Sequence, residues 1–362
     1  MPTLAIAGGT SASLGRAIVT ALLSSQRHNL WNAVILSRNN HIPLWLRAVD
    51  QIGVRTQVRA VDYLSVESLA KALKEVHTVV SVTSAIDGTQ AQIQKNILHA
   101  SVQEGCKRFA PSQWAFGPKG EANIESTKWS FAGVWDECLK HKEKIECARF
   151  NQGSYMNYIG HGIYPTPSKV DDETALQQIT TGNGYMAGED EACQGLLRQG
   201  DLKDGSGAFL IGIRNAIAEL PVKNDGSWPP VTMTTMRDVG RFFVASLELP
   251  KWEEEMSMVG DTLTIGELLS HAQNASGSKF RVDLVKRADL EKRLQELPPD
   301  DFVGRMWAEF KLAYIRDLDD EMVLKPIVNQ LCPEVQHMGV LEYMKTFWPL
   351  AARDSMVKEG VS

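Results

Sequence analysis

Residues 3–23 read Thr3-Leu-Ala-Ile-Ala-Gly-Gly-Thr-Ser-Ala-Ser-Leu-Gly-Arg-Ala-Ile-Val-Thr-Ala-Leu-Leu23. The apolar run at its start is typical of a buried parallel strand, and the apolar positions from Leu14 onward recur with the period of one helical face. Between them, Gly9, Ala12 and Gly15 form a G-x-x-G-x-x-G frame with alanine at its centre. Small residues let the backbone turn tightly and approach a pyrophosphate, which the free N–H groups of the next helix bind. The stretch predicts a dinucleotide site, and a strand-to-helix turn without a ligand is the simpler alternative.

The alternation of strand and helix continues along the first 150 residues. We expect strands at 33–36, 56–60, 78–83, 106–111 and 146–150, with helical patterns between them, among them one over 90–103. This order predicts an α/β fold, a Rossmann-type doubly wound parallel sheet with right-handed crossovers. Ligands bind such sheets at the carboxyl ends of the strands. The residues expected there are Gly9, Thr10, Ser11, Ala12, Ser13, Leu14, Gly15, Ser37, Arg38, Asn39, Asp62, Tyr63, Thr83, Ser84, Ser112, Gln113 and Trp114.

The end of the second predicted strand carries Arg38 and no acidic residue. In dinucleotide folds this position faces the adenosine ribose, where a carboxylate favours the 2′-hydroxyl and an arginine accommodates a 2′-phosphate. Arg38 therefore favours NADP(H) over NAD(H), although a solvated surface arginine is the simpler interpretation. Asp62, after the third strand, either holds the adenine amino group or N-caps the next helix.

Composition limits the class of protein. The chain has 362 residues, 43% of them hydrophobic and 23% charged, and a formal net charge of −6. No basic tract stands out, so we expect no nucleic-acid partner. Its five cysteines form no C-x-x-C pair and no Cys/His cluster at zinc spacing, which predicts buried thiols and no metal site. We expect a cytoplasmic protein with no membrane partner, because neither a signal peptide nor a long apolar run is seen.

The second half carries local signals for loops and helices. Residues 160–230 are rich in Gly, Pro, Asp and Asn, a composition typical of loops. Thr264 and Glu267 predict a capping box, with Gly277 at the end of that helix. Further helices are expected over 286–296 and 301–316, and Met306 and Phe310 in the second are interpreted as core or lid residues.

Several stretches together resemble a known family. They read Gly8-Gly-Thr-Ser-Ala-Ser-Leu-Gly-Arg16, Leu36-Ser-Arg38, Lys107-Arg-Phe-Ala-Pro-Ser-Gln-Trp114 and Arg149-Phe-Asn-Gln-Gly-Ser-Tyr-Met-Asn-Tyr158. As a set they resemble the NmrA-like, isoflavone-reductase-like branch of the atypical short-chain dehydrogenases, and 231–247 with 259–268 resembles its fungal members. The resemblance implies an NADP(H)-binding Rossmann domain over 1–158, to which strands from about 209–248 return. It implies a smaller α/β substrate lobe with C-terminal helices over 159–362.

The resemblance also implies roles for single residues. It places the pyrophosphate on the turn at 9–15 and the 2′-phosphate on Arg38. It places the nicotinamide beside Thr83, Ser84, Pro111, Ser112, Asn151, Gly153 and Tyr155. Reductases of this family carry a lysine in a K-x-x-V frame, and that position here is Phe131, in a helix expected over 130–139. The candidate catalytic residues are therefore Lys128, one helical turn earlier and otherwise a solvated surface group, and Tyr155.

Aromatic and polar residues near the same sheet edge are candidates for substrate contact. The set is Gln113, Trp114, Phe116, Tyr158 and His161. Trp114, Phe116 and Trp129 supply apolar area for a pocket wall, which favours a large aromatic or polycyclic substrate. His161 is equally compatible with catalysis and with a local hydrogen bond.

Two functions fit these features. The first is an NADP(H)-dependent reductase of a C=C, imine, iminium or carbonyl group in a bulky aromatic or alkaloid-type natural product. By analogy with fungal secondary metabolism, a stereoselective cyclisation can be coupled to this reduction. The second is an NADP(H)-sensing regulator without turnover, and the missing lysine fits both. We expect a small-molecule substrate and a monomer or homodimer, and the enzyme interpretation requires that Trp114 and Tyr155 leave a cavity open.

Overall fold

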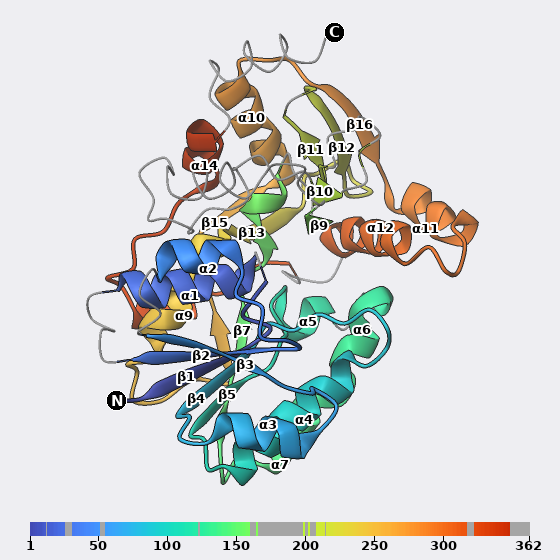
Figure 1. Cartoon of the computed structure of the whole chain (residues 1–362). Coiled ribbons are helices and arrows are strands. Elements are labelled where there is room, and N and C mark those ends of the chain that lie inside the picture. The colour runs from blue at the N-terminus through green and yellow to red at the C-terminus, as the bar shows by residue number, and fades with distance from the viewer. Residues whose placement is uncertain are drawn as a thin grey trace, which may run out of the picture.

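A six-stranded parallel sheet organises the first half of the chain in the computed structural model (Figure 1). Its order is β3-β2-β1-β4-β5-β6, which confirms the predicted Rossmann-type sheet. The strands are β1 (Thr3–Ala7), β2 (Asn32–Ser37), β3 (Thr56–Ala60), β4 (Thr78–Ser81), β5 (Arg108–Ala110) and β6 (Glu146–Cys147). The order reverses between β1 and β4, and the carboxyl ends of these two strands form the crevice where such sheets bind ligands.

The structure describes residues 1–11, 13–25, 31–50, 55–121, 124–159, 164–165, 198–199, 202, 208–213, 215–316 and 322–347. The predictions made for Ala12 and His161, and most of the expected loop region, lie outside these residues. Among the described helices, none is long and apolar enough to cross a lipid bilayer.

Helices cover both faces of the sheet. In Figure 1, α1 and α2 lie on one face with α9, a helix from the second half, while α3, α4 and α7 lie on the other. The helices of the first half are α1 (Leu14–Ser24), α2 (Leu44–Val49), α3 (Val66–Leu73), α4 (Gln90–Gln103), α5 (Gly117–Glu121), α6 (Glu125–Phe131) and α7 (Val134–Lys140). Apolar side chains explain this layering, because Leu4 and Ile6 of β1 pack with α1 and Ala5 and Ala7 with the opposite layer.

The single helix expected over 130–139 is wrong. The chain instead ends α6 at Phe131 and begins α7 at Val134. Gly133 separates them in the left-handed conformation, at φ 65°, which glycine adopts without steric cost. Phe131 and Val134 therefore belong to different helices, and the side chain of Phe131 is free to point away from α7.

Part of the second half returns to the nucleotide-binding sheet. Helix α9 (Met236–Ser246) packs on α1, and β14 (Glu255–Ser257) pairs in parallel with β7 (Arg149–Asn151), which continues β6 past Ala148. Within the expected 209–248, α9 is the part that packs on this lobe, and the strand that returns, β14, lies beyond residue 248. Residues 211–221 instead form β11 (Ile211–Gly212) and β12 (Ile217–Pro221), which pair with β16 (Arg281–Val285) outside this sheet.

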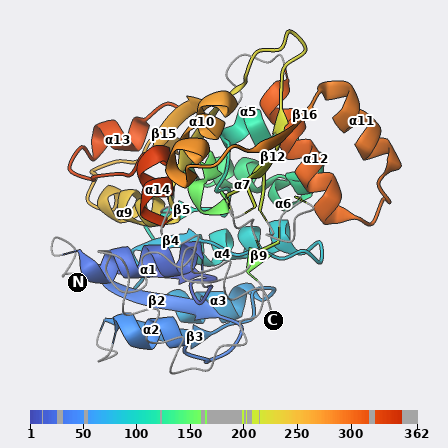
Figure 2. The ribbon, with the colours of Figure 1, turned by 90° about the horizontal axis from the view of Figure 1, so that it is seen from above.

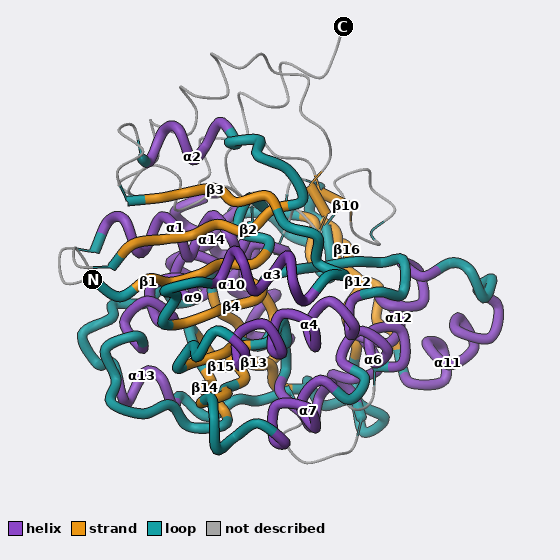
Figure 3. The backbone as a smooth tube through the Cα atoms, turned by 60° about the horizontal axis from the view of Figure 1, so that its bottom comes forward, coloured by secondary structure: helices purple, strands orange, loops and turns teal. Residues whose placement is uncertain are grey.

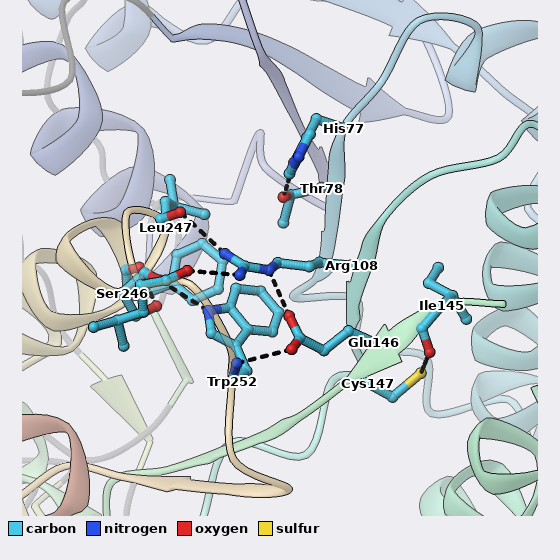
Figure 4. A network of polar contacts seen from close by, with 11 residues as sticks. His77, Thr78, Arg108, Ile145, Glu146, Cys147, Ser246, Leu247 and Trp252 are labelled. Carbon is cyan, nitrogen blue, oxygen red and sulfur yellow. Dashed lines mark hydrogen bonds and ion pairs between the residues drawn. The ribbon is translucent and has the colours of Figure 1, made fainter. Parts of the chain in front are cut away.

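Arg108, at the amino end of β5, links the sheet to the carboxyl end of α9 (Figure 4). Its guanidinium donates to the carboxylate of Glu146 at 2.5 Å and to the carbonyl oxygens of Leu247 and Leu249 at 3.0 and 2.6 Å. Trp252 closes the network, because its backbone N–H donates to Glu146 and its indole N–H to the Ser246 carbonyl. This contact fixes the end of α9 and so the position of α1 above the sheet.

The remaining elements build a second lobe. A three-stranded sheet joins β8 (Ser154–Tyr155), β13 (Pro230–Thr234) and β15 (Asp261–Thr264), and β9 (Tyr164–Pro165) pairs with β10 (Arg198–Gln199). The helical elements are η1 (Met156–Tyr158), α10 (Ile265–Ser276), α11 (Arg287–Glu296), α12 (Phe302–Ile315) and α14 (Val340–Phe347). Helix α13 (Ile327–Leu331) instead packs on α9 and β14 beside the first sheet. The predicted capping box of Thr264 and Glu267 is confirmed, with Gly277 ending α10. Figure 2 shows α12 beside α6, although α6 ends at residue 131 and α12 begins only at residue 302.

Candidate active site

The turn after β1 needs glycine for close packing. Gly8 has φ +80°, and a Cβ on Gly9 would lie 2.8 Å from Cγ2 of Ile6. A Cβ on Gly15 would lie 2.9 Å from Cα of Gly9, so the start of α1 sits directly against the turn. This arrangement is the one by which dinucleotide folds bring backbone N–H groups close to a pyrophosphate.

The first turn of α1 carries no negative side chain. It contains no acidic residue, and Ser13 at the N-cap makes no side-chain capping hydrogen bond, although the Ser11 hydroxyl accepts the Gly15 N–H at 3.2 Å. By contrast, Ser65 caps α3 and Thr235 caps α9 through their hydroxyl oxygens. A phosphate at the start of α1 would meet the positive end of the helix dipole without a competing carboxylate. The turn therefore fits the group that the sequence predicts for it.

Tyr63 couples this turn to the end of β2. Its hydroxyl group donates to the Leu36 carbonyl at 2.7 Å and accepts the Gly8 N–H at 2.9 Å. Burial raises the pKa of Tyr63 to about 12, while the Gly8 N–H and the charge of Arg38 act in the opposite direction. Tyr63 therefore stays protonated at neutral pH, and its hydroxyl group holds the glycine turn against the end of β2.

The ends of β2 and β3 present polar side chains to solvent. Arg38 and Asn39 are exposed, and the hydroxyl groups of Ser37 and Thr10 lie 3.4 Å apart. The proposed capping role of Asp62 is wrong, because Ser65 is the N-cap of α3. Asp62 is exposed and accepts the backbone N–H of Leu64 at 2.9 Å. Its second possible role, contact with an adenine, stays a prediction.

A cavity of about 370 Å³ opens beside the glycine turn. It runs from Ser13 and Leu14 past the carboxyl ends of β4 and β5 to the second lobe. Its wall is mostly apolar and aromatic, and none of the described lining residues carries a formal charge. The lining residues are Ser13, Leu14, Val82, Thr83, Ser84, Ala85, Ile86, Gln90, Ser112, Trp114, Ala115, Phe116, Ile124, Thr127, Trp129, Ser130, Phe131, Tyr155, Tyr158, Met236, Phe302, Met306 and Phe310.

Two glutamines of α4 hold the floor of the cavity. Gln90 donates through Nε2 to the carbonyl oxygen of Thr83 at 2.7 Å, and the Ser112 hydroxyl donates to the same carbonyl at 2.9 Å. Gln94 accepts the Ser112 N–H at 2.5 Å and donates to the Ser130 carbonyl of α6 at 3.2 Å. The loops after β4 and β5 and helix α6 are thus fixed to one another by buried amides. Neither glutamine was singled out in the sequence, because their roles depend on partners that the fold brings together.

Trp114 and the two tyrosines form the aromatic part of the wall. Trp114 stacks on Phe150 with ring centroids 5.6 Å apart and donates its indole N–H to the Ser81 carbonyl at 2.8 Å. Tyr155 and Tyr158 meet edge to face at 5.3 Å. Burial, and to a smaller extent the neighbouring Tyr158, raises the pKa of Tyr155 well above its ordinary value. Tyr155 is therefore a neutral phenol at physiological pH, able to donate a hydrogen bond but unsuited to act as a base.

The two positions tied to the missing lysine lie in different surroundings. Phe131 lines the cavity with its ring. Lys128 lies outside the set of lining residues, its side chain is 58% exposed, and its Nζ lies 3.1 Å from Oε1 of Glu125. Lys128 thus has the surroundings of a surface ion pair, and only Tyr155 of the two catalytic candidates faces the cavity.

Several residues predicted to contact the cofactor or substrate lie outside the cavity wall. Gln113, Pro111 and Asn151 are buried outside the cavity wall, and Asn151 donates to Glu255 at 2.8 Å. A Cβ on Gly153 would lie 2.1 Å from the Thr232 carbonyl oxygen, so this glycine permits the pairing of β8 with β13. Phe302 also lines the cavity, although its sequence position was not expected at the site. The signal was present, since Phe302, Met306 and Phe310 are four residues apart and share one face of α12.

Two fungal oxidoreductases are similar to this chain over most of its length. The oxidoreductase BOA1 of Botryotinia fuckeliana is 26% identical over 287 residues, which cover 77% of this chain and 78% of that protein. The oxidoreductase swnN of Metarhizium robertsii is 24% identical over 376 aligned positions, covering 97% of this chain and 98% of that protein. Both relatives are fungal proteins.

A solved structure shares the fold over nearly the whole length. The leucoanthocyanidin reductase of Vitis vinifera, in a binary complex with NADPH, covers 95% of this chain and 99% of its own, with a TM-score of 0.64 and 16% identity. Residues 2–160, which include the sheet, the glycine turn and the loops under the cavity, match the NmrA-like family. Over this segment the chain is similar to the NmrA-like family, which confirms the resemblance inferred from its motifs.

Proposed function

We propose that the chain is an NADP(H)-dependent oxidoreductase that reduces a bulky, largely apolar substrate. The names of the two fungal relatives and the NADPH in the leucoanthocyanidin reductase structure support the cofactor and the reaction class. The glycine turn, the first turn of α1 without an acidic residue, and the exposed Arg38 fit the phosphates of such a cofactor. The cofactor carries the redox chemistry, so the chain has to bind it, orient it and select the substrate.

The cavity is the observation that carries the proposal. It adjoins the glycine turn through Ser13 and Leu14, extends for about 370 Å³ and ends on aromatic rings of both lobes. Trp114 and Tyr155 line this space and leave it open. An open apolar space beside a dinucleotide turn favours an enzyme over a regulator that only senses NADP(H), because a sensor has no need for it.

The charge and shape of the wall limit the substrate. Bound NADPH supplies a hydride from C4 of its nicotinamide ring. Phe131 and its aromatic neighbours orient a flat substrate and exclude water, and Tyr155 offers a neutral hydroxyl group to a substrate oxygen or nitrogen. With no charged side chain among the described lining residues, the favoured substrate is one that accepts hydride without a strong acid. An iminium ion or an activated conjugated C=C group has this property, as in an aromatic or alkaloid-type natural product.

A coupled cyclisation and a regulatory role are two further possibilities for this chain. A stereoselective cyclisation after the reduction follows from the resemblance to fungal enzymes of secondary metabolism. The regulator remains the second candidate function because the position of the family lysine is occupied by Phe131.

Cofactor preference is tested by fluorescence titration with NADPH and NADH. Wild-type protein should prefer NADPH, and Arg38→Asp should weaken NADPH binding about 10–100-fold, the range expected when a charge-assisted phosphate contact is lost. Arg47→Asp makes the same charge change at an exposed arginine of α2 and is the control, which should keep the preference. Equal affinity of the wild type for both cofactors would contradict the role given to Arg38.

Turnover is tested by following NADPH oxidation at 340 nm with bulky cyclic iminium ions and aromatic enones. Substrate-dependent oxidation is the expected result. Tight NADPH binding together with no oxidation by either class would instead favour the regulator.

A further inference from the structure

A group of metal-ligating side chains lies away from the cavity, on the outer side of α4 and α7. His99 Nε2 lies 3.0 Å from Oε1 of Glu137, and His141 Nε2 lies 3.5 Å from the same oxygen. The ligand atoms of the three side chains all lie within 4.8 Å of one another. The two imidazole rings meet nearly edge to face, with centroids 5.6 Å apart.

Helix packing brings these residues together. Glu137 and His141 are four residues apart, so they share one face at the end of α7. His99 comes from α4, which contacts α7 along this face, and Figure 3 shows the two helices side by side. The sequence gives no sign of the group, because 38 residues separate His99 from Glu137.

We propose that His99, Glu137 and His141 bind one divalent transition-metal ion, with Zn²⁺ as the best match. Zn²⁺ accepts imidazole nitrogen and carboxylate oxygen at about 2.0–2.2 Å in a tetrahedron, which places neighbouring ligand atoms roughly 3.3 Å apart. The distances of 3.0 and 3.5 Å to Glu137 Oε1 already approach that spacing. Mg²⁺ and Ca²⁺ prefer sites made only of oxygen, so two histidines disfavour them.

The surroundings permit entry and a fourth ligand. The side chains of His99, Glu137 and His141 are 40%, 18% and 24% exposed, so an ion can reach them and water can complete the tetrahedron. Lys140 holds the other carboxylate oxygen of Glu137, with Nζ 2.8 Å from Oε2. This ion pair orients the carboxylate and leaves Oε1 directed at the histidines, while the charge of Lys140 moderates the affinity for a cation.

A bound ion would fasten α7 to α4. Because α4 carries Gln90 and Gln94, which hold the loops under the cavity, the ion would stabilise the layer that supports the site. The proposal concerns ion binding and stability, and it does not depend on the proposed function or on the identity of a substrate.

The test uses the full-length chain without a histidine tag, stripped with EDTA and titrated with Zn²⁺ by isothermal titration calorimetry at neutral pH. One ion should bind per chain, and saturation should raise the melting temperature. His99→Ala and His141→Ala should each weaken binding at least about tenfold and remove the rise in melting temperature. Circular dichroism of each variant checks that it folds.

His271→Ala is the matched control. His271 follows Glu267 by four residues on α10, so this pair repeats the spacing of Glu137 and His141, but among the described residues no third metal ligand lies beside it. The control should bind Zn²⁺ like the wild type. A wild-type chain without stoichiometric binding, or unchanged affinity in both His99→Ala and His141→Ala, would overturn the proposal.

Discussion

Phe131 gives the cavity an apolar surface where the family resemblance implies a lysine. Its ring lines a space of about 370 Å³ whose described walls carry no charge. A single side chain at this point can therefore decide which substrates fit while leaving the nucleotide turn untouched, because the turn and Arg38 belong to other elements.

Enlarging this side chain should separate substrate binding from cofactor binding. Phe131→Trp inserts a larger ring into the cavity, and overpacking of about 1–3 kcal/mol corresponds to roughly 5–150-fold weaker substrate binding. NADPH affinity, measured by fluorescence titration, should stay within about twofold of wild type. Leu139→Trp places the same ring on an exposed position of α7 and should change neither quantity. Loss of NADPH binding in Phe131→Trp would show that Phe131 supports the cofactor site itself.

Helix α9 from the second half of the chain packs closely on α1 from the first half. A Cβ on Gly240 would lie 2.5 Å from the carbonyl oxygen of Ala17, a backbone atom that cannot move away alone. Gly240→Ala should therefore push the helices apart and lower the free energy of unfolding by about 1–3 kcal/mol, measured by urea denaturation. Gly339→Ala, whose Cβ would meet only a carboxylate oxygen of Asp261 at 3.3 Å, should cost less. Equal losses in the two variants would contradict the role of this close approach.

The elements differ in how far the sequence predicts them. The strands and helices up to β5 follow local patterns, and the helix expected over 90–103 has the bounds of α4. The break at Gly133 escaped prediction because a lone glycine within an apolar helical pattern does not by itself signal a left-handed turn. The pairing of β14 with β7 is a long-range contact that no local pattern encodes.

Some residues of the site could be predicted from local sequence, and others could not. Trp114, Phe116, Tyr155 and Tyr158 were assigned to a pocket because they follow strand ends of the sheet, and all four line the cavity. Phe302, Met306 and Phe310 line the cavity only because α12 packs beside α6. His99 meets Glu137 and His141 only because α4 packs against α7. Such residues become visible once tertiary structure is known.

For the molecule as a whole, a partly buried charge network joins α11, α12 and β12 of the second lobe. Lys311 of α12 is fully buried and pairs with Glu219 of β12, which also receives two hydrogen bonds from Arg293 of α11 at 2.7 and 3.1 Å. Burial raises the pKa of Glu219, but the hydrogen bonds and charges of Arg293 and Lys311 outweigh it and lower the pKa to about 2. The same α12 presents Phe302, Met306 and Phe310 to the cavity, so this network sets the position of one wall of the site.

The stability of the whole chain should therefore depend on pH through Glu219. Because its folded pKa lies below the ordinary 4.5, its contribution is complete above about pH 4.5 and is lost as the pH falls toward 2. Glu219→Gln leaves Lys311 buried without its carboxylate and should cost about 3–5 kcal/mol at pH 7 in urea denaturation. The difference between the variant and the wild type should shrink by about 2 kcal/mol at pH 3, since the unfolded wild-type carboxyl group is protonated there and its folded counterpart is not. Glu219→Gln combined with Lys311→Met also removes the buried ammonium group and should recover part of the loss, whereas a difference that is the same at both pH values would show that Glu219 is not ionised in the folded chain.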